Sequence, residues 1–133
     1  MRVARVLETC LYVDDLEVAK AFYDEVLGLE PFAQVEGRHV FFRCREAVVL
    51  LFNPEQSGRP SGSVPPHGAR GPGHIAFAVE DASLSSWREH LRRHGVTIEA
   101  EVDWPGGGRS IYFRDPAGNS VELTTPETWG LEK

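Results

Sequence analysis

A chain of 133 residues has the length of one domain, and its 41% hydrophobic and 26% charged residues are ordinary for a globular protein, which excludes collagen-like and disordered chains. No apolar run approaches the roughly 20 residues needed to span a bilayer, and the N-terminus lacks a signal-peptide pattern, so we expect a cytoplasmic protein. The formal net charge of −6, with Lys and Arg scattered along the chain, argues against nucleic acid or an anionic membrane as partner.

The first half of the chain predicts a strand, a helix and three further strands. Residues 5–13 alternate in polarity and are rich in β-forming residues, and residues 14–29 carry a helical pattern. Asp14 or Asp15 is the expected N-cap of the helix, and Gly28 is the expected stop. Three short strand patterns follow, at residues 31–35, 38–44 and 47–53. The predicted order is β-α-β-β-β.

The second half repeats this order. Residues 73–80 are the expected strand, and Asp81 or Ser83 can cap a helix that Gly95 ends. Three strand patterns follow, at residues 97–102, 109–114 and 120–125. We therefore expect one domain of two tandem modules, with these approximate bounds: module 1 at 1–54, a Gly/Pro/Ser-rich linker at 55–72, module 2 at 73–126 and a C-terminal tail at 127–133.

Self-similarity between the halves supports a duplication. Residues 13–15 (Val-Asp-Asp) align with residues 79–81 (Val-Glu-Asp) at an offset of 66, which places Glu8 opposite His74. Residues 48–54 align with residues 120–126 at an offset of 72, which places Leu50 opposite Glu122.

Two stretches, LYVDDLEVAKAFYDEVLGL (11–29) and RSIYFRDPAGNSVEL (109–123), together with the repeated β-α-β-β-β order, resemble the vicinal oxygen chelate superfamily. That superfamily includes glyoxalase I, extradiol dioxygenases, methylmalonyl-CoA epimerase, fosfomycin-resistance thiol transferases and bleomycin-binding proteins. The resemblance implies an α+β fold of two tandem βαβββ modules that form a cupped mixed β-sheet. It also implies a homodimer and a small-molecule substrate.

Strand alternation places three chemically active side chains on one face of the predicted sheet. On the first strand the better core face is Leu7, Thr9, Leu11 and Val13, and the other face holds Glu8, Cys10 and Tyr12. The same count puts His74 opposite Ile75 and Phe77, and Glu122 opposite Val121 and Leu123. Two carboxylates and an imidazole on one face are costly to desolvate, whereas a divalent cation cancels their charge. We therefore predict a metal site of Glu8, His74 and Glu122.

The resemblance implies a similar ligand set. Metal ligands of the superfamily lie at the positions of Glu8, Leu50, His74 and Glu122, and Leu50 cannot bind metal. The chain is therefore closer to the three-ligand arrangement of the thiol transferases and dioxygenases, although those relatives usually carry His at the position of Glu8. A Glu, His, Glu set suits Zn²⁺, Ni²⁺, Mn²⁺ or Fe²⁺.

Each proposed ligand also has a structural interpretation. His74 can be a hydrogen-bonded strand histidine, and Glu122 can be a partly exposed edge carboxylate. Glu8 can form an ion pair, for which Arg109 and Arg43 are the candidates. A binding cup without metal remains open.

Five further residues are candidate substrate contacts: His39, Phe41, His67, Arg109 and Tyr112. Alternation gives His39 and Phe41 the same orientation as the metal face, and puts Tyr112 there together with Ser110 and Arg114. The resemblance to the thiol transferases implies that Tyr112 reaches substrate. His39 is either a general base or a solvent-exposed strand residue, Arg109 either holds a substrate anion or lies on the surface, and His67 belongs either to a lid or to a solvated tether.

The expected function is a metal-dependent enzyme of the glyoxalase type on a small oxygenated substrate. The resemblance implies lyase or isomerase chemistry through a metal-stabilised enediolate, with Glu122 or Glu8 as the base. The alternatives are a fosfomycin-type thiol transferase and a metal-free, bleomycin-type sequestering protein. Extradiol oxygenation ranks lower, because it uses two histidines and one carboxylate and the count here is reversed.

Overall fold

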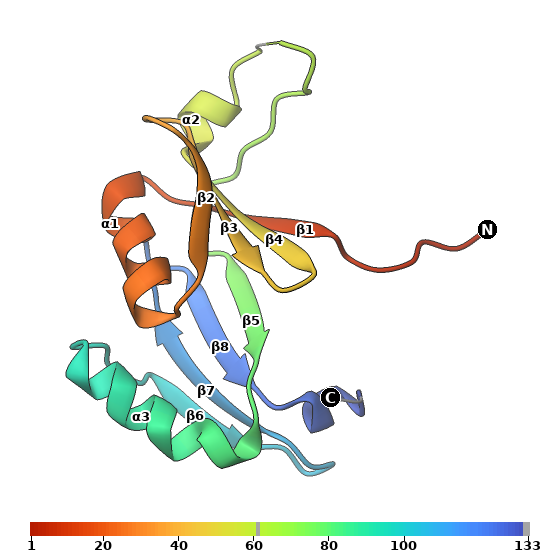
Figure 1. Cartoon of the computed structure of the whole chain (residues 1–133), viewed down its shortest axis with the longest axis vertical. Helices are drawn as coiled ribbons and strands as arrows, with labels where there is room; N and C mark the ends of the chain where they lie inside the picture. The colour runs from red at the N-terminus through yellow and green to blue at the C-terminus, as the bar shows by residue number, and fades with distance from the viewer. Residues whose placement is uncertain (61, 132–133) are drawn as a thin grey trace. The chain divides into compact units, whose positions relative to one another are not determined.

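The computed structural model describes residues 1–60 and 62–131, which divide into two compact units between Gly71 and Pro72. Each unit contains a strand, a helix and three further strands (Figure 1). Ser61 of the predicted linker and residues 132 and 133 of the predicted tail lie outside the described residues. The predicted fold class, α+β with two tandem βαβββ modules, is confirmed.

The first unit forms a four-stranded mixed sheet in the order β1-β4-β3-β2. β1 pairs with β4 in parallel, and the other two pairings are antiparallel. Its elements are β1 (Glu8–Tyr12), α1 (Leu16–Ala21), the π-helical turn η1 (Phe22–Val26), β2 (Glu30–Val35), β3 (His39–Cys44), β4 (Ala47–Phe52) and the short α2 (Pro54–Ser57).

The helix of the first unit begins and ends where its sequence predicts. The Asp15 carboxylate caps α1 by accepting a hydrogen bond from the Val18 amide, 3.2 Å away. The predicted continuous helix widens into η1 after Ala21, and Gly28 ends it with a φ of +69°. Tyr23 of η1 is fully buried and packs its ring 6.0 Å from the ring of Phe42 on β3, which fixes the helix on the sheet.

The second unit forms a sheet with the same connectivity, in the order β5-β8-β7-β6. β5 pairs with β8 in parallel, and the remaining pairings are antiparallel. Its elements are β5 (His74–Ala78), the 3₁₀ turn η2 (Asp81–Ser83), α3 (Leu84–Arg93), β6 (Ala100–Asp103), β7 (Arg109–Arg114), β8 (Ser120–Thr124) and the 3₁₀ turn η3 (Pro126–Trp129). In Figure 1, α3 runs alongside this sheet.

One face of each sheet supplies the hydrophobic core, and we call it the core face. In the first unit it contains Leu11, Val40, Phe42, Val49 and Leu51, all buried. In the second unit it contains Ile111, Phe113, Val121 and Leu123, all buried, with Ile75 and Phe77 half-buried. The other side of each sheet, which we call the opposite face, carries the predicted site residues. Alternation of side chains thus predicts both faces over most of each sheet.

The predicted core face of the first strand is wrong at one end. Leu7 is 60% exposed and Thr9 is also exposed, whereas Leu11 and Val13 are buried. β1 begins at Glu8, so Leu7 lies before the strand, and its backbone contact is the Leu7 carbonyl that accepts from the Val48 amide. Alternation gives the side of a residue but not how far along the strand the core extends.

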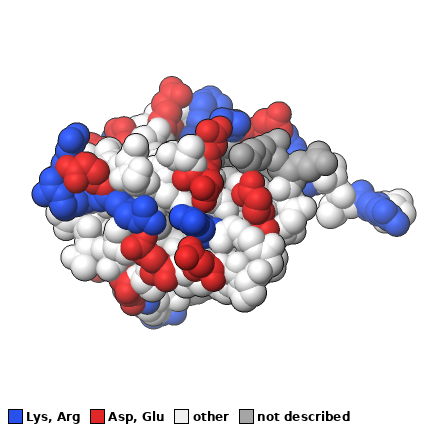
Figure 2. Space-filling view, turned by 90° about the horizontal axis from the view of Figure 1, so that it is seen from below, with Lys and Arg blue, Asp and Glu red and all other residues white. Residues whose placement is uncertain are grey.

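Charged side chains of both signs are interspersed on the surface. Figure 2 shows Lys and Arg side chains next to Asp and Glu on the face in view. Several of these neighbours form ion pairs in the second unit, including Arg88 with Glu101 at 2.6 Å and Arg114 with Glu99 at 2.8 Å. In the part of the chain that the structure describes, no helix is long and apolar enough to cross a membrane.

Candidate functional site

The DPAGN turn (115–119) fixes the start of β5. The buried Asp115 carboxylate accepts hydrogen bonds from the amides of Ala117 and Asn119, both at 2.9 Å. The Asn119 side-chain oxygen in turn accepts from the Gly73 amide at 2.7 Å. The turn therefore holds the residue that directly precedes His74.

His74 presents an acceptor nitrogen to Glu122. Its Nδ1 lies 3.1 Å from the Ser120 carbonyl oxygen, and because a carbonyl only accepts, Nδ1 carries the proton. In the neutral ring Nε2 then holds a lone pair. That nitrogen lies 3.2 Å from Oε1 of Glu122, which is also an acceptor. Two acceptors face each other, so either a proton on the imidazole or a cation must lie between them.

This pair fits two adjacent ligands of one metal ion. Ligand atoms each about 2.1 Å from an ion of tetrahedral or octahedral geometry lie about 3.0–3.4 Å apart, and the observed separation is 3.2 Å. The hydrogen bond from Nδ1 to the Ser120 carbonyl is the kind of contact that usually orients a metal-bound histidine. His74 is half-exposed, whereas Glu122 is only 7% exposed, so the carboxylate is the buried anchor of the pair.

Glu122 lies at the centre of the opposite face of its sheet. Its direct neighbours across the strands are Ala76 and Tyr112, and the small Ala76 leaves space beside the carboxylate. Burial raises the pKa of Tyr112, and the charge of Glu122 and a hydrogen bond to it raise this pKa further. The Tyr112 phenol therefore stays protonated at neutral pH and donates a hydrogen bond to Glu122. Ser110 donates a second hydrogen bond to Oε2 of Glu122 at 2.6 Å.

Glu8 occupies the same place in the first sheet that His74 occupies in the second. Glu8 pairs with Val48 in the parallel register, as His74 pairs with Ser120, which reproduces the sequence offsets of 66 and 72. Its side chain is exposed and makes no ion pair within the described part of the first unit. Arg43, one of its candidate partners, instead lies over the ring of Phe32, 4.2 Å from the centroid. Glu8 thus remains available as a ligand.

Neither unit contains the whole predicted metal site. Among the described residues of each unit, no group of three His, Cys, Asp or Glu side chains is close enough to hold one ion. The predicted ligand set takes Glu8 from the first unit and the other two residues from the second. In the second unit, the two predicted ligands His74 and Glu122 lie next to each other.

The opposite face of the first sheet is aromatic. The rings of His39 and Phe41 stack 4.1 Å apart, and Phe52 lies 5.6 Å from each of them in an edge-on arrangement. His67 packs 4.6 Å from Phe52, and its Nδ1 lies 2.7 Å from the hydroxyl of Tyr12. Three of the predicted substrate contacts, His39, Phe41 and His67, therefore belong to one aromatic cluster.

The contacts of His39 and His67 restrict their roles. Burial and the charge of Arg38 lower the pKa of His39, and the Arg38 guanidinium, which can only donate, lies 2.6 Å from Nδ1 of His39. His39 is therefore neutral with its proton on Nε2, and its basic nitrogen is occupied. The His67 backbone is held by Ser57, whose carbonyl accepts from the His67 amide and whose hydroxyl donates to the His67 carbonyl. His67 is thus anchored in the first unit.

Arg109 faces carboxylates of its own unit. Its Nε lies 3.6 Å from Asp81 and 3.5 Å from Asp103. These residues border a cavity of about 510 Å³ lined also by Trp104, Gly107, Gly108, Thr125 and Glu127. With two acids beside it, the guanidinium is a weak candidate for gripping a substrate anion.

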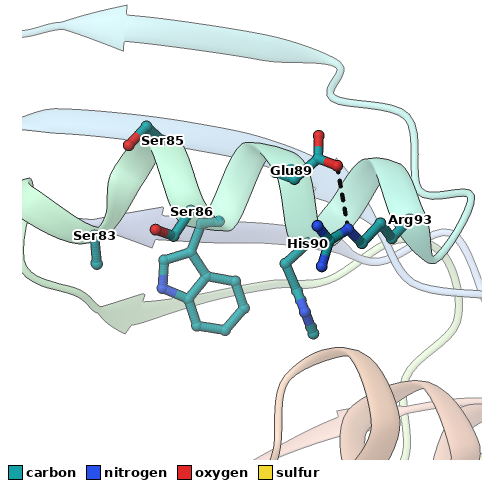
Figure 3. Close-up of a pocket in the computed structure, with 7 residues that line it drawn as sticks. Ser83, Ser85, Ser86, Glu89, His90 and Arg93 are labelled. Carbon is teal, nitrogen blue, oxygen red and sulfur yellow. Dashed lines mark hydrogen bonds and ion pairs between the residues drawn. The ribbon is translucent and has the colours of Figure 1, made fainter.

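A second cavity, of about 660 Å³, lies along α3. It is lined by Ser83, Ser85, Ser86, Trp87, Glu89, His90 and Arg93. In Figure 3, Ser85 and Glu89 project to one side of the helix and His90 to the other, and a dashed line joins Glu89 to Arg93, 3.1 Å apart. Glu89 also binds Arg92, so its charge is neutralised by neighbours on the same helix. This cavity contains none of the predicted site residues.

Sequence reasoning missed two groups that hold the site. Ser110 was placed on the metal face without a role, and its hydroxyl binds Glu122. Asn119, which the sequence analysis does not single out, holds Gly73 by accepting a hydrogen bond from its amide. Alternation could have suggested Ser110 as a neighbour of Glu122, whereas the Asn119 contact joins residues 46 apart and has no sequence pattern.

The sequence profile of the Glyoxalase/Bleomycin resistance protein/Dioxygenase superfamily matches residues 4–123. The chain belongs to this superfamily. A solved lactoylglutathione lyase from Agrobacterium tumefaciens is 40% identical, with a TM-score of 0.94 over 98% of this chain and 100% of that one. The lactoylglutathione lyase of Salmonella typhimurium is 29% identical over 131 residues and 90% of each chain. The metallothiol transferase FosB of Bacillus licheniformis is 29% identical over 114 residues, which cover 85% of this chain and 70% of that one.

These comparisons confirm the superfamily predicted from the sequence. The similar proteins include both lyases and thiol transferases, which are two of the enzyme classes that the sequence left open.

Proposed function

We propose that this protein is a metal-dependent enzyme of the glyoxalase type, with lyase or isomerase chemistry on a small substrate that carries vicinal oxygens. The observation that carries the proposal is the separation of 3.2 Å between His74 Nε2 and Glu122 Oε1, which matches two adjacent ligands of one ion. Similarity to a lactoylglutathione lyase at 40% identity over 98% of the chain supports this class above the others.

Glu8, His74 and Glu122 would hold one divalent cation, which we expect to be Zn²⁺, Ni²⁺, Mn²⁺ or Fe²⁺. When bound, the ion supplies a Lewis acid for the substrate oxygens. The equivalent registers of Glu8 and His74 in the two sheets support Glu8 as the third ligand. Leu50, equivalent to Glu122, supplies no fourth ligand, so the coordination would leave positions for the substrate.

Glu122 and Glu8 differ in burial and in hydrogen-bond partners, which decides which of them can act as the base. Glu122 is buried and receives hydrogen bonds from Ser110 and Tyr112, which fix its position. Glu8 is exposed and has no such partner within the described part of its unit. We therefore assign Glu122 as the fixed ligand and the Glu8 carboxylate as the base that takes a proton next to the substrate carbonyl.

Candidate substrate contacts lie on the opposite face of each unit. The Tyr112 hydroxyl, whose proton is directed to Glu122, can accept a hydrogen bond from a substrate hydroxyl. The stacked rings of His39 and Phe41 offer a flat surface for an apolar part of the substrate. His67 and Arg109 stay as weaker candidates, because His67 is bonded to Tyr12 and Arg109 lies next to two acids.

A thiol transferase is the second candidate. Similarity to FosB and to the glutathione transferase FosA of Serratia marcescens, 31% identical over 113 residues, favours it. The surroundings of Arg109 argue against it, because a phosphonate would need basic groups that are free of acidic neighbours. A metal-free sequestering protein would not need the His74–Glu122 pair.

The test is metal analysis of the purified protein followed by a thermal-shift screen of Zn²⁺, Ni²⁺, Mn²⁺ and Fe²⁺. We expect about one equivalent of metal per chain, and a gain of about 2.7 kcal/mol in unfolding free energy at an ion concentration of 100 times Kd. Formation and breakdown of lactoylglutathione, and transfer of a thiol to an epoxide, are then assayed with the metal-loaded protein. Light scattering on the same sample tests the predicted homodimer.

Glu122→Gln and His74→Ala serve as the site variants. Glu99→Gln and His94→Ala are their matched controls, because both control residues lie on the surface of the same unit. Loss of metal in the site variants but not in the controls supports the proposal. A metal-free, stable protein that binds none of the four ions would overturn it and favour sequestration.

A further inference from the structure

We propose that Trp104 and Ser110 are positioning residues for Glu122, joined to it by hydrogen bonds that all point toward its carboxylate. This inference rests on the proposed function, because it assigns Glu122 its role as a metal ligand. The Trp104 Nε1–H donates to the Ser110 Oγ at 2.9 Å. The Ser110 hydroxyl donates to Oε2 of Glu122 at 2.6 Å.

Proton counting gives these bonds a single direction. An indole nitrogen can only donate, and an ionised carboxylate can only accept, so the one hydroxyl proton of Ser110 must go to Glu122. The Thr124 hydroxyl lies 2.9 Å from Ser110 and also donates to the Arg109 carbonyl at 3.3 Å. Thr128 lies 2.9 Å from the Thr124 hydroxyl. One directed series, from Trp104 through Ser110, therefore ends on Glu122.

Burial makes this network costly to disrupt. Ser110 is 1% exposed, and Glu122 and Thr124 are each 7% exposed. No buried side-chain polar atom among the described residues lacks a partner. Loss of the Ser110 hydroxyl would remove a hydrogen bond from Oε2 of the buried Glu122 and would free the N–H of the more exposed Trp104.

The glycine-rich loop after β6 is what brings Trp104 to Ser110. The Trp104 amide donates to the Gly108 carbonyl and the Gly107 amide donates to the Trp104 carbonyl, which closes a tight loop. Gly107 and Gly108 have φ values of +100° and +90°, which favour glycine. A Cβ at Gly108 would collide with the backbone and hydroxyl of Thr128. The loop thus needs glycine in order to hold the indole over Ser110.

The consequence for the site is single-oxygen ligation by Glu122. Oε2 is occupied by Ser110, and Oε1 points to His74 Nε2. The carboxylate cannot rotate to offer both oxygens to an ion without losing the bond to Ser110. Trp104 and Ser110 would therefore raise metal affinity by fixing one oxygen in place, although neither residue binds the ion.

The first arm of the test needs no metal. The chain has three tryptophans, Trp87, Trp104 and Trp129, whose indole N–H signals can be assigned by substitution with Phe. In the metal-free protein we expect Ser110→Ala and Glu122→Gln each to shift the Trp104 signal in a ¹H–¹⁵N spectrum. The signals of Trp87 and Trp129 should stay in place.

The second arm measures affinity for Mn²⁺ and the visible spectrum of the Co²⁺-loaded protein. We expect Ser110→Ala to weaken Mn²⁺ binding about 10- to 100-fold. Trp104→Phe, which keeps the aromatic ring and removes the N–H, should weaken binding about two- to tenfold. Trp129→Phe and Ser85→Ala, at exposed sites of the same unit, are the matched controls and should bind Mn²⁺ like the wild type.

The outcomes separate the two proposals. Two results would overturn the positioning role. The first is a Trp104 indole signal that does not shift in Glu122→Gln. The second is a Mn²⁺ affinity and a Co²⁺ spectrum that stay unchanged in both Ser110→Ala and Trp104→Phe. A wild-type protein that binds no Mn²⁺ or Co²⁺ overturns the proposed function, and the indole signal then decides by itself whether Trp104 senses Glu122. If Ser110→Ala fails to fold, Trp104→Phe carries the test.

Discussion

At equivalent rows of their sheets, the two units carry different side chains on the opposite face. A row is a set of residues that pair across three neighbouring strands, and three rows of the first unit correspond to three of the second. The first row is Glu8, Val48 and Arg43, which corresponds to His74, Ser120 and Arg114. The other two are Cys10, Leu50 and Phe41 with Ala76, Glu122 and Tyr112, and Tyr12, Phe52 and His39 with Ala78, Thr124 and Ser110. In the middle row a leucine and a phenylalanine of the first unit correspond to a glutamate and a tyrosine of the second. The backbone is repeated, and the chemistry is not.

This difference shows that two sheets with the same backbone topology can carry side chains suited to different contacts. In the first unit the opposite face is filled by aromatic rings that pack on one another, such as His39 on Phe41. In the second unit the same positions hold hydroxyls that donate to one buried carboxylate, Glu122. The first face suits apolar contact, and the second suits a charged group.

The largest expected effect is on metal binding, when Glu122 is replaced by leucine, the residue at the equivalent position of the first unit. Glu122→Leu should weaken binding of a divalent ion at least about 100-fold, because it removes a direct ligand whose supporting partners alone are worth 10- to 100-fold. Calorimetric titration with Mn²⁺ measures it. Leu123→Val, on the core face of the same strand, is the control and should retain binding. Undiminished binding in Glu122→Leu would place the ion elsewhere.

The reciprocal exchange should act on stability. Leu50→Glu puts a carboxylate in the aromatic and apolar face of the first unit, where Leu50 is buried between Cys10 and Phe41. We expect the unfolding free energy of the metal-free protein to fall by about 1–3 kcal/mol. Urea denaturation measures it, with Leu50→Met as the volume-matched control. An equal loss in both variants would show that packing, rather than charge burial, sets the effect.

The two histidines His67 and His74 should separate stability from metal binding. His67→Ala removes a hydrogen bond to Tyr12 and a ring contact with Phe52, so the unfolding free energy should fall by about 1–2 kcal/mol. His74→Ala should leave thermal unfolding of the metal-free protein nearly unchanged, because its side chain is half-exposed, and should reduce Mn²⁺ affinity. The same effect of both substitutions on stability would contradict this division.

The smallest expected effect is a dependence of stability on pH that comes from Glu89 on α3. Hydrogen bonds from Arg92 and the charges of Arg92 and Arg93 lower the pKa of Glu89 on α3 from 4.5 to about 2. Because the folded pKa is the lower one, this contribution is complete above about pH 4.5 and is lost as the pH falls toward 2. Glu17 on α1 instead accepts from the neutral amide of Gln34.

Melting temperatures measured at about pH 6 and about pH 3 test this contrast. The wild type should exceed Glu89→Gln slightly at the higher pH, and the difference should shrink at the lower pH. Glu17→Gln is the matched control and should show a smaller change with pH. A larger stabilisation by Glu89 at the lower pH would contradict the expected sign.

The pairing of His74 with Glu122 could be predicted because it follows from local rules. Alternation fixes the face of each side chain, and the βαβββ repeat makes the two strands parallel neighbours. The repeat also predicted the match between Glu8 and His74, which the strand registers show. Apolar periodicity and glycine stops were enough to predict the order of elements.

The supporting residues of the site could not be predicted in the same way. The contact of Trp104 with Ser110 depends on the positive φ angles of Gly107 and Gly108, and a run of glycines in a sequence does not specify them. The sequence could suggest only a flexible approach to a strand at this point. The exposure of Leu7 was missed for a related reason, because alternation carries no information about where a strand begins.

Anomalous diffraction from crystals soaked in Mn²⁺, with data collected on both sides of the manganese absorption edge, tests the central claim most directly. We predict one peak in contact with His74 Nε2 and Glu122 Oε1, with the Glu8 carboxylate as the third protein ligand. Absence of a peak at His74 and Glu122, or a peak only at another pair such as His90 and His94 on α3, would contradict it.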